Sequence, residues 1–408
     1  MKNIIFIITF FVYSGYYAVL ALIIFMGNIS NSREITVPLR VISTLLMIYV
    51  ISILMRKHGL KTSNKYIYLT FILFWLLYFI KVLFHYFSGE PLMRSWYEYI
   101  FYAVNFCILP FFMNSLIDLN KFGRTILNAF ILSGFVMAVI VVILYIDVLI
   151  GGISRLSNLV YETGEETISP LALSYSGSLS IALCFYEILF SKGKKITYKI
   201  YLLLVVVVSF IIFFLGASRG SIVALILSFV FMLYSGTVRN RIKLIMLLIV
   251  FTPIVILGVI VTGSSIYDRA SNTFDGVETG RFELWNLALD TFYNNPIFGG
   301  LIEIVNAPGY NSNIYPHNIL IETLMSSGLI GFILLFSFFI PGWRRLIKMK
   351  KIRSQFNWIG IVLIQGLVQS MFSGAIYFSV LVFFPLGIIF SHNIKNVSSK
   401  KISKSVID

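Results

Sequence analysis

Long apolar runs separated by short polar breaks follow one another along almost the whole chain. Each run comes close to the roughly 20 apolar residues that cross a bilayer as a helix. The pattern therefore predicts an all-α polytopic membrane protein with about twelve transmembrane helices in a single domain over residues 1–391. The predicted spans are 4–27, 35–55, 66–87, 96–117, 125–150, 168–190, 200–216, 221–236, 244–263, 317–340, 358–373 and 375–391. The last two divide only at Ser373-Gly374.

Lysine and arginine are unevenly shared between the alternating loops. If the N-terminus is cytoplasmic, the inner segments carry 24 cations and the outer ones six. Positive charge concentrates on the cytoplasmic side of membrane proteins, so both termini are predicted to be cytoplasmic. The outer six are all arginines. The absence of lysine from the outer segments has a simple explanation if lysine is the preferred cytoplasmic anchor. Planar guanidinium groups, however, also suit a phosphate-bearing ligand on the outer face. Both explanations remain open at this point.

Composition excludes two other classes of protein. With 58% hydrophobic and 12% charged residues, the chain has too much apolar surface for a soluble domain. The net charge of +15 does not indicate a nucleic-acid partner, because the cations lie in short clusters between apolar runs. Cys107 and Cys184 both lie inside predicted spans, so neither a disulfide framework nor a metal site is expected.

One outer loop, residues 264–316, is far longer than a connection between helices requires, and such loops are usually functional. Within it, residues 281–293 predict a short amphipathic helix with an aromatic face, which we expect to lie along the bilayer interface. Asn295-Pro296 ends that helix. Residues 392–408 are predicted to be a polar, basic cytoplasmic tail.

Two candidate anion-binding features lie on the predicted outer face. The first is the tight turn Gly216–Ser221, in which Ser218 and Arg219 come directly before an apolar helix. Free N–H groups at a helix start, together with an arginine, can hold an anion. The second is Arg281 at the start of the predicted interfacial helix. Taken alone, each arginine could equally extend to lipid headgroups.

The third feature is Tyr315-Pro316-His317-Asn318, at the start of the tenth span. His317 is expected in the first turn of that helix, where the helix dipole disfavours the imidazolium and keeps the ring able to accept a proton. A capping or interfacial role is the simpler alternative. Glu322 lies inside the span, where a carboxylate needs a partner or a path to water. Five residues separate it from His317, about 140° around a helix, so the two need not touch.

Motifs of metal-dependent and nucleotide-hydrolysing enzymes are absent from the sequence. It contains no outer DxD, HExxH, CxxC or Walker loop. We therefore expect neither a metal nor a cofactor.

Taken in order, four short motifs resemble the O-antigen polymerase and O-antigen ligase superfamily. They are Ala217-Ser218-Arg219-Gly220, Gly280-Arg281-x-x-x-Trp285, Asn295-Pro296-x-x-Gly299, and Pro316-His317-Asn318 leading to Glu322 and Ser327-Gly328-Leu329-x-Gly331. The resemblance covers roughly residues 205–340. These proteins are similar to C-type glycosyltransferases, so the resemblance implies that kind of fold, with a large outer loop before the third-last span.

The resemblance implies a reaction and a location. The donor would be a glycan on undecaprenyl pyrophosphate, transferred to an acceptor hydroxyl at the outer face of the bacterial plasma membrane, without metal or nucleotide sugar. Arg219 and Arg281 would bind the pyrophosphate and His317 would be the general base, with Ser218, Asn318 and Glu322 in support. Other implied partners are the lipid bilayer and a chain-length regulator.

Three functions remain as alternatives. A polymerase of O-antigen, capsular or exopolysaccharide repeat units is favoured, because chains rich in Ile, Phe, Lys and Asn are typical of variable surface-polysaccharide loci. An O-antigen ligase, which transfers the glycan to lipid A core, would show the same motifs. A polysaccharide transporter or flippase would require ionisable residues along a central path. Here the charges within spans, such as Lys81, Glu98 and Asp147, lie near the outer ends, and only Glu322 supports transport.

Overall fold

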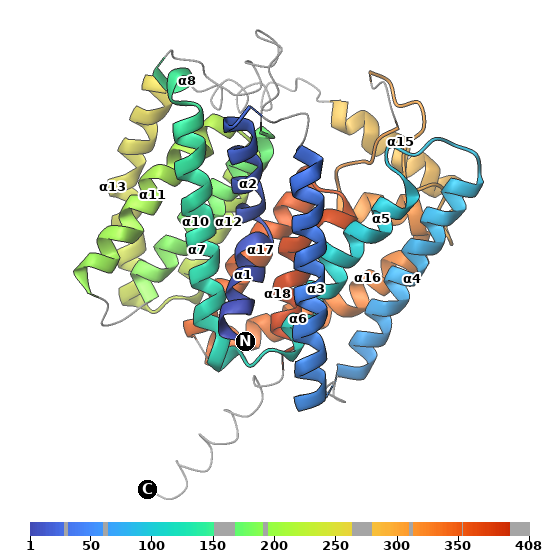
Figure 1. Cartoon of the computed structure of the whole chain (residues 1–408), viewed down its shortest axis with the longest axis horizontal. Helices are drawn as coiled ribbons and strands as arrows, with labels where there is room; N and C mark the ends of the chain where they lie inside the picture. Colours follow the sequence, from blue (N-terminus) through green and yellow to red (C-terminus); the bar gives the residue numbers. More distant parts are fainter. Residues whose placement is uncertain are drawn as a thin grey trace, which may run out of the picture. The chain divides into compact units, whose positions relative to one another are not determined.

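Most of the described residues lie in α-helices (Figure 1). The computed structural model describes residues 1–27, 32–59, 64–150, 168–190, 195–262, 280–309, 313–352 and 354–391. Within these ranges there is no strand beyond the isolated bridge between Ile304 and Ile314. The predicted tail, 392–408, lies outside the described residues, as do 264–279 of the predicted outer loop.

Two compact units share the chain, each assembled from three separate segments. Unit 1 comprises Met1–Val50, Asp118–Asp275 and Met349–Val368, and unit 2 comprises Ile51–Ile117, Gly276–Lys348 and Gln369–Asp408. The helices of unit 1 are α1 (Lys2–Phe11), α2 (Ser14–Phe25), α7 (Leu119–Leu144), α8 (Ile146–Ile150), α10 (Pro170–Phe190), α11 (Ile196–Gly216), α12 (Arg219–Ser235) and α13 (Val238–Thr262). Those of unit 2 are α4 (Lys65–Phe87), α5 (Trp96–Ala103), the π-helix η3 (Val104–Ile108), α6 (Leu109–Leu116), α15 (Gly280–Asn294), the 3₁₀ turn η5 (Ile376–Phe378) and α18 (Val380–Ile389).

Three further helices cross the unit boundaries along the chain. These are α3 (Ser32–His58), α16 (Ile319–Ile352) and α17 (Trp358–Phe372), the last preceded by the 3₁₀ turn η4 (Ser354–Phe356).

The helices include many that are long and apolar enough to span a bilayer. Seven meet that description individually, and α1 with α2 forms an eighth candidate that bends by 62°. Helices α12, α17 and α18 are apolar but shorter. The chain is therefore an all-helical polytopic membrane protein, as predicted, while the count of twelve spans stays a prediction.

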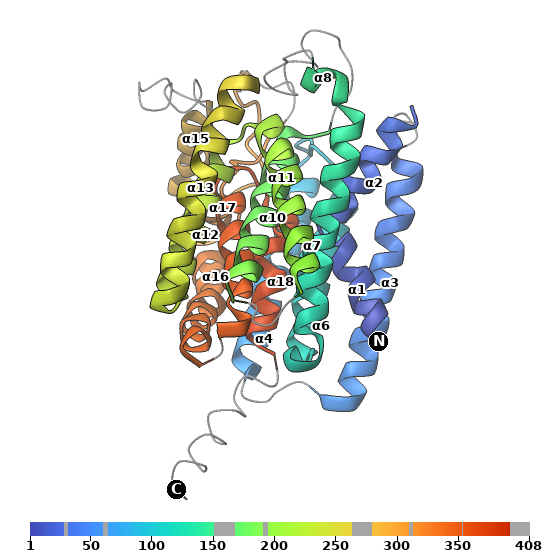
Figure 2. The same ribbon diagram turned by 90° about the vertical axis from the view of Figure 1, so that its left-hand side faces the viewer.

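Helix α10 lies at the centre of unit 1, packed against α7, α11 and α12 (Figure 2). It is buried along most of its length, and its first half is rich in serine, alanine and glycine. Ser176 donates to Ser14, and Ser178 donates to Gln365 at 3.0 Å. A Cβ on Gly177 would lie 2.7 Å from the Ser209 carbonyl, so the glycine lets α11 approach closely. Small residues and interhelical hydroxyl bonds are the usual means of helix association within a bilayer.

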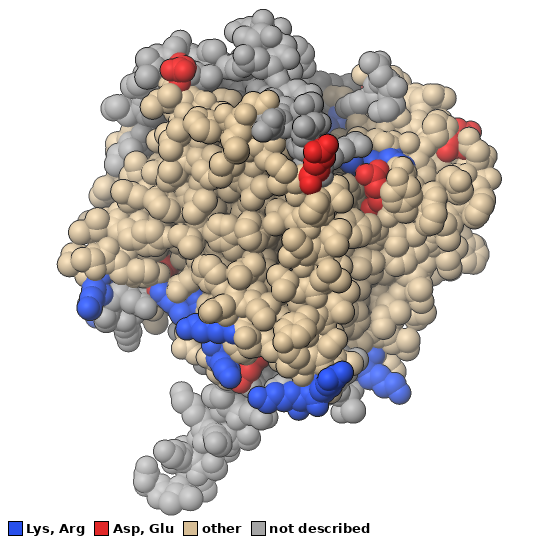
Figure 3. All heavy atoms as spheres, viewed as in Figure 1, with Lys and Arg blue, Asp and Glu red and all other residues tan. Residues whose placement is uncertain are grey.

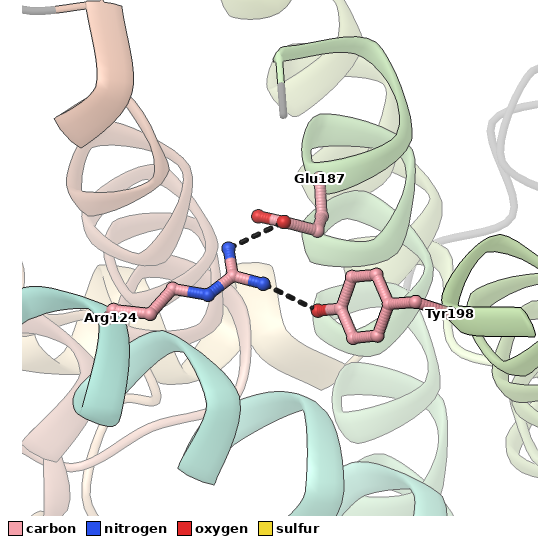
Figure 4. Close-up of polar contacts among 3 residues, drawn as sticks. All are labelled: Arg124, Glu187 and Tyr198. Carbon is pink, nitrogen blue, oxygen red and sulfur yellow. Dashed lines mark hydrogen bonds and ion pairs between the residues drawn. The ribbon is translucent and has the colours of Figure 1, made fainter. Parts of the chain in front are cut away.

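A buried carboxylate ties three helices of unit 1 together. Glu187 of α10 pairs with Arg124 of α7 at 2.5 Å, and Arg124 also donates to the Tyr198 hydroxyl of α11 at 2.8 Å (Figure 4). Glu187 is almost completely buried, and an unpaired carboxylate there would be costly. The pair explains how α10 tolerates an acid near its end.

Aromatic side chains fill the core of unit 2. The Phe71 ring of α4 stacks on Phe111 of α6, with centroids 3.9 Å apart, and its edges meet Phe338 and Phe383. Glycine again permits close contact, because a Cβ on Gly387 of α18 would lie 2.3 Å from the Phe111 carbonyl. These contacts join α4, α6, α16 and α18.

Helix α16 is broken at Gly328, whose φ of 60° and ψ of −157° are not helical. The chain after α15 fills the break. Leu329 N–H donates to the Pro296 carbonyl at 2.8 Å, and Gly300 N–H donates to the Met325 carbonyl at 2.7 Å. Lys81 of α4 donates to the Gly299 carbonyl at 3.0 Å. The loop thus satisfies backbone groups that the interrupted helix leaves free.

Much of the remaining surface is apolar. Large hydrophobic side chains are exposed along several helices, for example Leu45 on α3, Ile80 on α4 and Ile249 on α13. Charged side chains are sparse over the face drawn in Figure 3. Such surfaces are compatible with lipid and would be unusual in a soluble protein.

We expect the contact between Gly299 and Gly328 to be essential for stability. Both have positive φ, and a Cβ on Gly299 would lie 2.5 Å from Ser327 N, while one on Gly328 would lie 2.4 Å from the Ile297 carbonyl. Gly299→Ala or Gly328→Ala should each lower the free energy of unfolding by roughly 2 kcal/mol or more. The loss of stability is measured by thermal unfolding of the purified variants in detergent. Gly280→Ala is the control, since nothing lies within 4 Å of its Cβ position; equal unfolding temperatures would contradict the expectation.

Candidate functional site

Helix α15 covers the residues of the predicted interfacial helix and is fixed to unit 2 by an apolar cluster. Leu284 and Ala288 pack with Ile304, Ile314 and Met325. On the same helix, the Trp285 indole N–H donates to the Pro316 carbonyl at 2.9 Å. Trp285 and Pro316 belong to two of the short motifs recognised in the sequence, so the structure brings those motifs into contact. The position of α15 along a bilayer interface stays a prediction.

The chain between α17 and α18 is the point on which the predicted site residues converge. Arg281, in the first turn of α15, donates through its guanidinium to the Phe372 carbonyl at the end of α17. Glu322 of α16 accepts the Ile376 N–H at 2.9 Å. His317 makes a hydrogen bond with the backbone of Ser373. Three residues from two separate parts of the sequence therefore contact one short segment, residues 372–376.

His317 lies before α16, whereas the sequence had placed it in the first helical turn. Its φ is 57°, in the left-handed region that non-glycine residues seldom adopt. Asn318 takes the capping position, and its Oδ1 accepts the Leu320 N–H at 3.0 Å and the Ile321 N–H at 3.3 Å. The Tyr315 ring packs against the imidazole with centroids 4.4 Å apart. Such local strain is common at functional sites.

The imidazole of His317 is neutral for a different reason from the one expected. Burial, and after it the charge of Arg281, lower its pKa to about 4, against the opposing effect of the hydrogen bond to Ser373. The nitrogen Nδ1 is buried and has no hydrogen-bond partner. A neutral ring with a free lone pair can accept a proton at physiological pH.

Ser218 and Arg219 lie in unit 1, whereas Arg281, His317, Asn318 and Glu322 lie in unit 2. The turn before α12 is tight because Ala217 has φ of 41° and Ser218 is extended. Ser218 N–H donates to the Ser174 hydroxyl of α10 at 3.3 Å. Arg219 is half-buried in the first turn of α12.

Sequence reasoning missed several residues beside the candidate site. Glu303 is buried and accepts the Tyr99 hydroxyl, and Tyr377 of η5 packs on both Tyr99 and Tyr315. Burial raises the pKa of Glu303 above its ordinary value. Arg94, counted in the sequence only as an outer cation, lies over the Phe378 ring. Arg94 lies in a short loop far from the motifs in sequence, and no local pattern marks Glu303. Only the fold brings the two residues close to the candidate site.

Known proteins support the interpretation of this region. Residues 204–336 match the O-antigen ligase family model. The match covers about a third of the chain and agrees with the superfamily that the sequence motifs resemble. It contains Arg219, Arg281, His317 and Glu322, but the segment after α17 lies beyond it. Comparisons with curated proteins and with solved structures gave no match.

The region that matches the O-antigen ligase family model thus carries a charged guanidinium and a neutral imidazole that contact one segment. Such a pair can stabilise a developing negative charge and accept a proton. Within the described residues, no group of three or more His, Cys, Asp and Glu side chains is placed to hold a metal ion.

We expect the Glu322 side chain to act through the Ile376 N–H. Glu322→Ala should leave that buried donor without its acceptor, which costs roughly 1–3 kcal/mol, while Glu322→Gln retains an acceptor oxygen and should lose much less. Thermal unfolding of the purified variants measures the difference. Glu283→Ala, at an exposed position on α15, is the control. Equal losses for the Ala and Gln variants would show that the carboxylate charge, and not the bond to Ile376, is what stabilises this segment.

Proposed function

We propose that the protein is a membrane glycosyltransferase that polymerises oligosaccharide repeat units carried on undecaprenyl pyrophosphate, at the outer face of the bacterial plasma membrane. The observation that carries the proposal is the convergence of Arg281 and the neutral His317 on one segment, with both residues inside the O-antigen ligase match. Twelve spans, cytoplasmic termini and a C-type glycosyltransferase fold are parts of the same proposal.

In the proposed reaction, His317 accepts the proton of the acceptor hydroxyl through the free Nδ1. The hydroxyl oxygen forms a bond to the anomeric carbon of the donor, and the bond from that carbon to the phosphate oxygen breaks. Undecaprenyl pyrophosphate leaves with the bonding electrons. Arg281 stabilises the charge that develops on the leaving group. The neutral imidazole and the charged guanidinium suit these two roles without a metal.

A ligase is the second candidate, because the matching family model is described as O-antigen ligase. Polymerase and ligase differ in the acceptor, which is another lipid-linked repeat unit for the first and lipid A core for the second. Purified protein in liposomes supplied only with undecaprenyl-pyrophosphate-linked repeat units should form long glycans if it is a polymerase. Product that appears only after lipid A core is added would identify a ligase.

The proposed general base gives a mutational and a pH prediction. His317→Gln should reduce product formation by about 10²–10⁴-fold, since an amide cannot accept the proton, and protein level should be unchanged. Because the pKa of His317 is lowered to about 4, the base is competent above that pH. Activity should be nearly constant from pH 6 to 8 and should fall only as the pH approaches 4.

Two outcomes would contradict the assignment of His317 as the base. One is normal chain length from His317→Gln or His317→Asn, which would indicate a capping or orienting role. The other is a loss of activity centred near the ordinary histidine pKa of about 6.5. Arg281→Lys serves as a companion variant: it keeps the charge but loses the planar fork, so partial activity is expected.

The proposed orientation is testable with reporter fusions. The segment after α15 should be outside and the chain following α16 inside, because residues 341–357 carry six cations and no acid. Alkaline phosphatase fused after Asn306 should be active, and the same enzyme fused after Lys350 should be inactive. The reverse result would put the candidate site on the cytoplasmic side, where the proposed lipid-linked donor reaction is not expected.

A further inference from the structure

The loop that carries Arg94 is fixed to the candidate site by its backbone. Met93 N–H donates to the Glu303 carboxylate at 2.9 Å, and the Asn313 side chain donates to the Pro91 carbonyl. Glu303 lies on the segment that follows α15, and Asn313 lies two residues before Tyr315. Arg94 is therefore held at the end of unit 2 where His317 lies.

The Arg94 guanidinium is packed against aromatic rings and has no ion-pair partner among the residues that the structure describes. It lies 5.8 Å from the Tyr102 centroid and 5.7 Å from the Phe378 centroid. Its Nε–H is buried without an acceptor. Arginine stays protonated at any relevant pH, so a full charge with unused donor capacity remains here.

The nearest carboxylates are occupied by other donors. Glu303 accepts Met93 N–H and the Tyr99 hydroxyl. Glu98 accepts the Ser95 N–H at 3.2 Å, in a capping box at the start of α5, and the Tyr102 hydroxyl at 3.4 Å. Neither lies within ion-pair distance of Arg94. A guanidinium with a purely structural role would be expected to pair with one of these acids.

A row of rings connects Arg94 to the proposed base. Phe378 contacts Tyr377 at 4.6 Å between centroids, Tyr377 contacts Tyr315 at 6.3 Å, and Tyr315 contacts His317 at 4.4 Å. Burial raises the pKa of Tyr315 to about 12, while the charges of Arg94 and Arg281 both oppose that rise. The two arginines thus lie within electrostatic range of one phenol, and both contact the 372–378 segment.

We propose that Arg94 is a second anion anchor of the site, beside Arg281, and binds an oxyanion of the lipid-linked glycan substrate. The planar fork of an arginine held against aromatic rings matches a phosphoryl or carboxylate group. Two sources carry that chemistry, the pyrophosphate of the lipid and an acidic sugar in the repeat unit. The inference rests on the proposed function and adds to it a residue outside the region that matches the O-antigen ligase family.

Equilibrium binding to the full-length protein in nanodiscs tests the proposal. The probes are undecaprenyl pyrophosphate, inorganic pyrophosphate and a glucuronate-containing oligosaccharide. Arg94→Gln keeps much of the side-chain length and removes the charge, so affinity for at least one probe should fall roughly tenfold or more. The affinity of Arg94→Lys for the same probe should fall less than that of Arg94→Gln. The matched control is Arg344→Gln, which changes an exposed arginine of α16 and should bind every probe like the wild type.

The outcomes separate this proposal from the function on which it rests. A loss for the pyrophosphate probes assigns Arg94 to the lipid phosphate, and a loss for the oligosaccharide alone assigns it to an acidic sugar. If the wild type binds and Arg94→Gln binds equally well, the proposal for Arg94 is overturned while the function stands. If the wild type does not bind undecaprenyl pyrophosphate, the proposed function itself is overturned.

Thermal unfolding shows whether Arg94→Gln is folded, and if it is not, an unchanged affinity in Arg94→Lys still overturns the proposal.

Discussion

The hydrogen bond from the Ile376 N–H to the Glu322 carboxylate organises the candidate site. A helix that stops within the apolar part of a membrane protein leaves N–H and C=O groups that water cannot satisfy. The chain between α17 and α18 is such a place. Glu322 supplies an acceptor for Ile376, and Arg281 supplies a donor for the Phe372 carbonyl. The same contacts that satisfy the broken backbone therefore bring the charged side chains of the site together.

A second break follows the same principle. Helix α16 is interrupted at Gly328, and the loop around Gly299 takes over its hydrogen bonds. Neither glycine could carry a Cβ without collision, which gives the short glycine motifs of the sequence a physical reason. Because this loop directly continues α15, the interlock also restrains the helix that bears Arg281. Lys81 adds a bond to the Gly299 carbonyl, which gives a buried cation on α4 a specific partner.

Two of the sequence motifs contact each other in the folded protein. Trp285 donates to Pro316, so one motif fixes the backbone directly before His317. Glu322 is buried, and the Tyr315 ring packs against the His317 imidazole. In such surroundings electrostatic interactions are stronger than in water. The arrangement suits stabilisation of the phosphate leaving group in the proposed reaction.

The sequence by itself determined the helical class, the approximate helix ranges, and the candidates Arg281, His317 and Glu322, because apolar runs and isolated polar residues are local properties of the chain. The tertiary structure alone decided what those residues contact. It placed His317 outside the helix in a left-handed conformation, and made burial the main cause of its low pKa. It also brought Arg94 to the segment after α17, which no motif marked. These features depend on contacts between segments about 50 to 280 residues apart, and no local pattern of hydrophobic and polar residues encodes such pairings.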